Sequence, residues 1–61
     1  MYSNQSFAGF TSIDAAQSFR SEAGGWIFKA ENGQIIWFAM SFTPSKILLH
    51  TATAGLSGSL V

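Results

Sequence analysis

The side chains that most often carry catalysis or bind metals are scarce in this sequence. It has a single histidine, His50, three acidic residues and no cysteine. The acidic residues Asp14, Glu22 and Glu31 form no motif, whereas paired-carboxylate chemistry needs two of them in one cleft. Asp14, His50 and a serine make a triad only on paper, because no Gly-x-Ser-x-Gly elbow is present. We therefore expect no enzyme activity, no cofactor and no metal site.

Aromatic side chains together with a few cations allow a second kind of chemistry, the binding of nucleic acid. Bases would stack on exposed rings of Trp26 or Phe38, while Arg20, Lys29 and Lys46 would neutralise phosphates. Three cations are balanced by three anions, however, so the release of counterions would contribute little affinity. A small nucleic-acid-binding regulator is therefore the alternative hypothesis, behind protein–protein interaction.

Size and composition favour self-association. A domain of 61 residues buries only about 60% of the surface that its unfolded chain exposes. Disulfides are excluded because there is no cysteine, so we expect a homodimer or higher oligomer to supply the missing stability. Only 10% of the residues are charged, against about 25% in an ordinary domain. This composition predicts that part of the surface is covered in the working state.

No membrane partner is expected. The longest wholly apolar run, Ile35 to Met40, is far too short to cross a bilayer. The first residues lack the positive and apolar regions of a secretory signal, and the absence of cysteine fits a reducing compartment. We therefore expect a cytoplasmic protein.

The local signals predict one small α+β domain over residues 1–61, in the order helix, β-hairpin, helix. Residues 1–10 are expected to form an extended arm or a short strand. A helix is expected over 12–23, with Thr11 or Ser12 as its N-cap, Asp14 in its first turn and Gly24 as its stop. A second helix over 44–54 begins at Thr43-Pro44, since proline is well suited to the first helical position. Residues 55–61 are expected to form a flexible tail.

A β-hairpin is predicted over residues 25–40, centred on Asn32-Gly33. This dipeptide favours a two-residue type I′ turn, which would place Lys29 opposite Ile36 and Trp26 opposite Ala39. Cross-strand partners share a face of the sheet, so this register predicts one wholly apolar face. That face would hold the expected core residues Trp26, Phe28 and Trp37 together with Ala30, Ile35 and Ala39.

The other face of this hairpin is the predicted interaction surface. Near the open end of the hairpin it would carry four large apolar side chains, Ile27, Ile36, Phe38 and Met40. Methionine and aromatic residues are enriched at protein interfaces. The sequence thus favours a non-enzymatic interaction module that binds itself and another protein. Accessory, inhibitor or regulator proteins of phages and other mobile elements are often of this size, and we expect a role of that type on size alone.

Overall fold

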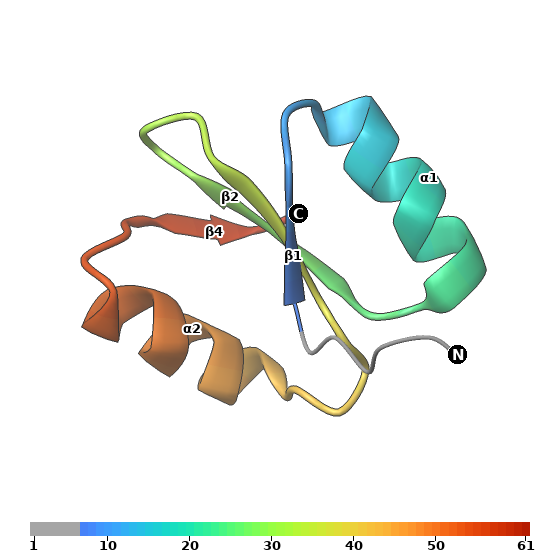
Figure 1. Ribbon diagram of the computed structural model, residues 1–61. Coiled ribbons are helices and arrows are strands. Elements are labelled where there is room, and N and C mark those ends of the chain that lie inside the picture. Colours follow the sequence, from blue (N-terminus) through green and yellow to red (C-terminus); the bar gives the residue numbers. More distant parts are fainter. Residues whose placement is uncertain (1–6) are drawn as a thin grey trace.

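The computed structural model of the chain describes residues 7–61, which form two helices and a four-stranded antiparallel sheet (Figure 1). The elements follow in the order β1 (Phe7–Phe10), α1 (Ile13–Ala23), β2 (Trp26–Ala30), β3 (Ile35–Phe38), α2 (Pro44–Thr53) and β4 (Gly58–Leu60). The α+β class expected from the sequence is confirmed. The helix–hairpin–helix order is incomplete, because a strand precedes the first helix and another follows the second. The first six residues of the predicted arm lie outside the described residues.

The sheet has the strand order β1-β3-β2-β4, so the predicted hairpin is its centre. One edge, β1, comes from the segment expected to be an arm or a short strand, and the other, β4, comes from the expected tail. Strand β1 pairs with β3, and β4 pairs with β2, in both cases antiparallel. These pairings join segments that are far apart in the sequence. Local sequence patterns therefore do not show which strands β1 and β4 pair with.

Both helices begin at the capping residues that the sequence indicates. The Ser12 hydroxyl accepts a hydrogen bond of 3.0 Å from the Ala15 N–H, and Thr43 accepts one of 3.2 Å from the Lys46 N–H. The first helix ends at Gly24, whose φ of 74° lies in the region that favours glycine. Helix α1 therefore spans Ile13–Ala23 where residues 12–23 were expected, and α2 spans Pro44–Thr53 where 44–54 were expected.

The hairpin turn differs from the type I′ turn predicted at Asn32-Gly33. The Ala30 N–H donates to the Gln34 carbonyl at 2.8 Å, and the Gly33 N–H donates to the Ala30 carbonyl at 3.1 Å, which closes a three-residue loop. Within residues 7–61 no residue other than glycine has a positive φ, so Asn32 lacks the conformation that type I′ requires. Gly33 alone supplies the positive φ, at 96°.

This longer loop shifts the register of the hairpin by one residue. Trp26 faces Phe38 instead of Ala39, and Lys29 faces Ile35 instead of Ile36. Because side chains alternate along a strand, a shift by one residue moves every β3 side chain to the opposite face. The predicted apolar face is therefore wrong: Phe28 and Trp37 lie on opposite sides of the sheet.

Each side of the sheet has its own small core and its own helix. Helix α1 covers the first core, which contains Ala16, Ile27, Ile35 and Trp37. Helix α2 covers the second, which contains Phe28, Ala30, Phe38 and Ile47. Of the three residues expected in the core, Phe28 and Trp37 are buried, whereas Trp26 is half-buried and donates its indole N–H to the Phe42 carbonyl at 2.9 Å.

The topology explains why the two helices lie on opposite sides (Figure 1). The connection from β1 to β2 passes over β3, and the connection from β3 to β4 passes over β2, in the same direction across the sheet. The starting strands β1 and β3 are antiparallel, however. Two right-handed crossovers with these directions must place their helices on opposite faces, and the two cores have this arrangement.

Candidate functional site

The four residues of the predicted interaction surface do not share a face. Ile27 is buried under α1, whereas Phe38 is buried on the α2 side of the sheet, with exposed fractions of 1% and 0%. Ile36 is half-buried on the side of Phe38, and only Met40 is widely exposed, at 72%. The expectation failed because the register is shifted and because α2 covers the face that was predicted to be open. Met40 remains available for an interface.

The three cations of the nucleic-acid alternative are divided between the two sides of the sheet. Arg20, on α1, donates its Nε–H to the Gly25 carbonyl at 3.0 Å. Lys29 is exposed and lies opposite Ile35, so it points to the α1 side. Lys46 is exposed in the first turn of α2, on the other side. The structure thus does not gather Arg20, Lys29 and Lys46 into one basic patch.

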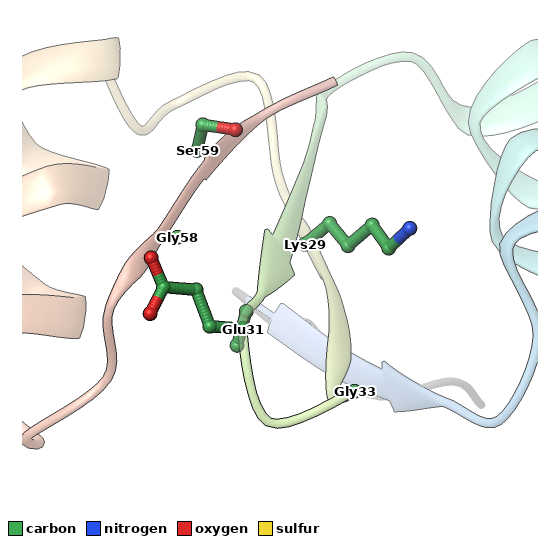
Figure 2. Close-up of a pocket in the computed structure, with 6 residues that line it drawn as sticks. Lys29, Glu31, Gly33, Gly58 and Ser59 are labelled. Atoms are coloured by element: carbon green, nitrogen blue, oxygen red, sulfur yellow. The ribbon is translucent and has the colours of Figure 1, made fainter.

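An open hollow of about 470 Å³ lies between the hairpin turn and β4 (Figure 2). Its lining residues are Lys29, Ala30, Glu31, Gly33, Gly58 and Ser59. In Figure 2 the Lys29 side chain points away from the Glu31 carboxylate, so the two charged groups do not converge on a common point. Among residues 7–61, every deeply buried side-chain nitrogen or oxygen has a hydrogen-bond partner.

His50 packs among aromatic rings. Its exposed imidazole lies 5.6 Å from the ring of Phe7, 5.9 Å from that of Phe38 and 6.2 Å from that of Phe42, measured between centroids. In the described part of the chain, no group of three or more potential ligands is placed to hold a metal ion. His50 acts here as an aromatic side chain that shields the buried ring of Phe38.

Among residues 7–61, the most distinctive surface feature is the edge of the sheet formed by β1, which has half-exposed aromatic rings on both sides. On the α2 side, Phe7 is 48% exposed and its ring lies 6.1 Å from that of Phe38. On the α1 side, Phe19 is 39% exposed and its ring contacts Phe10 and, edge-on at 4.8 Å, Trp37. The strand itself is Phe-Ala-Gly-Phe, without the charge, proline or bulge that usually protects an edge.

The hairpin register determines which backbone groups of β1 face outward. The Ala30 N–H donates to the Gln34 carbonyl, so these two residues form a hydrogen-bonded pair of the β2–β3 ladder. Hydrogen-bonded and non-hydrogen-bonded pairs alternate along an antiparallel ladder, so Ile35 and Trp37 of β3 turn their backbone groups away from β2 and toward β1. Their partners Phe10 and Ala8 must therefore turn inward. The N–H and C=O groups of the two remaining β1 residues, Phe7 and Gly9, point away from the sheet.

Gly9 leaves an open space at the β1 edge. Its missing side chain would point to the α2 side, because Gly9 lies opposite Ile36. A Cβ atom at this position would meet no atom of the described residues within 4 Å, so residues 7–61 leave the space above Gly9 open. Phe7 and Gly9 stand two residues apart on the same side of the strand, so a protruding ring is next to an empty space.

The opposite edge, β4, is shorter and more polar. Its exposed residue Ser59 lies opposite the exposed Lys29 of the neighbouring strand β2. Other exposed apolar side chains are spread over α2 and the loops: Met40, Leu48, Leu49 and Val61.

Sequence reasoning missed the β1 edge because four residues, Phe-Ala-Gly-Phe, carry too short a pattern to show a period. The unprotected composition of residues 7–10 was the available signal.

Comparison with known proteins finds no relative: no family model, no curated protein and no solved structure matches this chain. Neither helix within residues 7–61 has both the length and the apolar character that a membrane span requires. The surface geometry of the chain is therefore the basis for its functional assignment.

Proposed function

We propose that this protein is a small non-enzymatic interaction module that self-associates and acts by binding another macromolecule, as an accessory, inhibitor or regulator protein. The observation that carries the proposal is the β1 edge, an unprotected apolar strand with half-exposed aromatic rings on both sides. Both faces of the sheet are already covered by the chain's own helices. The rings thus stay exposed after the helices and strands of residues 7–61 have packed together.

The size of this surface supports association. An aromatic side chain offers about 200 Å² of area, so about 100 Å² of Phe7 and about 80 Å² of Phe19 stay in contact with water. Within residues 7–61 no strand lies beside the outward backbone groups of β1, and an uncharged edge of this kind favours pairing with another strand. Burial of the rings and pairing of the backbone would both be favourable, and no charged side chain of the strand would lose its hydration.

Sedimentation velocity of the purified chain over about a hundredfold range of concentration tests the proposal. We expect the sedimentation coefficient and the melting temperature to rise together with protein concentration, since mass action stabilises an associating fold. High salt should preserve the association, because the β1 edge is apolar. A monomer at every concentration, with a constant melting temperature, would contradict self-association.

A further inference from the structure

We infer that two copies of the chain pair through their β1 strands, antiparallel and around a two-fold axis at Ala8, so that Phe7 of each copy lies over Gly9 of the partner subunit. This inference rests on the proposed self-association and specifies its geometry. It assigns the β1 edge to one occupant, a second copy of the same chain.

The backbone of β1 defines the register of this pairing. The outward N–H and C=O groups belong to Phe7 and Gly9, and Ala8 lies between them with its groups turned inward. An antiparallel pair centred on Ala8 places Phe7 opposite the partner's Gly9, and Gly9 opposite the partner's Phe7. Each of these pairs exchanges both of its N–H···O bonds. The two four-stranded sheets thereby become one continuous sheet without an exposed β1 edge.

The side chains fit the same register. Phe7 and Gly9 lie on the α2 side of the sheet, and cross-strand partners share a face. The ring of Phe7, 48% exposed in the monomer, therefore lies over the partner's Gly9, where the structure leaves open space. Covering a strand glycine with a cross-strand aromatic ring is a stabilising arrangement in sheets. The two-fold axis forms this contact twice, as an isologous interface requires.

Other registers of β1 fit less well. A pair centred on Gly9 would bring the two glycines opposite each other and leave the open space unfilled. It would also place Phe7 opposite the partner's Thr11, which lies beyond the end of the strand. The strand carries no charge, so pairing of two identical strands brings no like charges together. Within the four residues of β1, only the axis at Ala8 places the ring of Phe7 over the open space above the partner's Gly9.

Gly9→Val is the variant that tests this geometry. Gly9 has no positive φ and its Cβ direction is open, so valine fits the monomer and suits a strand. In the dimer the new side chain occupies the space required by the partner's Phe7. We expect a folded protein whose dimer dissociates at least about tenfold more readily, as measured by sedimentation. Ser59→Val, the same side chain at an exposed position on the opposite edge strand, should leave the dimer unchanged.

Amide hydrogen exchange on the unaltered chain gives a second test that does not depend on a variant. The Phe7 and Gly9 amides should be protected only at concentrations where the dimer forms, because their N–H groups point outward in the monomer. The Ala8 and Phe10 amides should be protected at every concentration, because they donate to β3. These four adjacent residues thus report on both edges of one strand.

The outcomes separate this inference from the proposed self-association. A protein that dimerises while Gly9→Val dimerises equally well, or while its Phe7 and Gly9 amides exchange freely, would overturn the β1 pairing and leave self-association standing. A protein that is monomeric at all concentrations would overturn both. A third outcome is a monomer whose Phe7 and Gly9 amides become protected only when a short extended peptide is added. This result would overturn the β1–β1 pairing and show that the β1 edge binds a strand of another protein.

Discussion

Phe38→Ala is the most direct test of the second core, because Phe38 is fully buried on the α2 side of the sheet. Truncation to alanine removes about 150 Å² of buried apolar surface, which corresponds to roughly 4 kcal/mol at 25 cal/mol per Å². This value lies within the range of about 3 to 5 kcal/mol typical of such truncations. A chain of 61 residues has a total stability of only about 3 to 9 kcal/mol. We therefore expect about half or more of the free energy of unfolding to be lost.

Urea unfolding monitored by tryptophan fluorescence measures this loss. With a denaturant slope of about 1 to 2 kcal/mol/M, the midpoint should fall by about 2 to 4 M. Leu49→Ala is the matched control, since Leu49 is 69% exposed and its truncation should cost less than about 0.5 kcal/mol. Phe38→Glu should unfold the chain at every concentration, because it buries an unpaired charge. A folded, monomeric Phe38→Glu variant would refute the burial of Phe38 and restore the interface predicted from the sequence.

Three further predictions concern the hairpin turn, the core residue Trp37 and the edge strand β4. Gly33→Val should lower stability by about 1 to 3 kcal/mol in thermal unfolding, because valine strains the positive φ of 96°; an unchanged melting temperature would contradict the turn. Trp37→Ala should cost about 3 to 5 kcal/mol, whereas Trp37→Phe, which loses mainly the 2.6 Å bond from the indole N–H to the Gly24 carbonyl, should cost less. Gly58→Ala should detach β4, because a Cβ there meets the Lys29 backbone carbonyl, and loss of amide protection at Val61 would report it.

The helices could be predicted from the sequence because their signals are local. A hydroxyl at Ser12 or Thr43 caps the free N–H groups of a first turn wherever that helix lies in the fold. Proline at position 44 fits the first helical position for the same reason. Such signals act within one turn of helix and require no knowledge of the tertiary structure.

The hairpin register could not be determined from Asn32-Gly33 alone. The same dipeptide fits a two-residue type I′ turn and a three-residue loop in which only the glycine has positive φ. In this chain the Asn32 side chain accepts a hydrogen bond of 2.9 Å from the Gln34 N–H, which suits the longer loop. The length of this loop thus determines the register of the hairpin and, with it, which side chains face each helix. The predicted interaction surface was wrong because it assumed the two-residue loop.

The candidate site could not be predicted because it depends on contacts across the whole chain. Phe7 is recognisable as an edge residue only after it is known to pair with Phe38. The space above Gly9 likewise depends on the position of α2 relative to the sheet. Residues 7–10 alone show an apolar composition without a charge, which was compatible with an arm, a strand or an interface.

The interleaved strand order β1-β3-β2-β4 has a consequence for how this protein unfolds. The β1–α1–β2 unit has a gap that only β3 fills, and the β3–α2–β4 unit has a gap that only β2 fills. Neither half of the chain therefore contains a complete hydrogen-bonded ladder of its own. Loss of either helix uncovers a face of the same central hairpin and weakens the support of the other helix. We therefore expect the two layers to unfold together, as one cooperative unit, although the chain has two distinct cores.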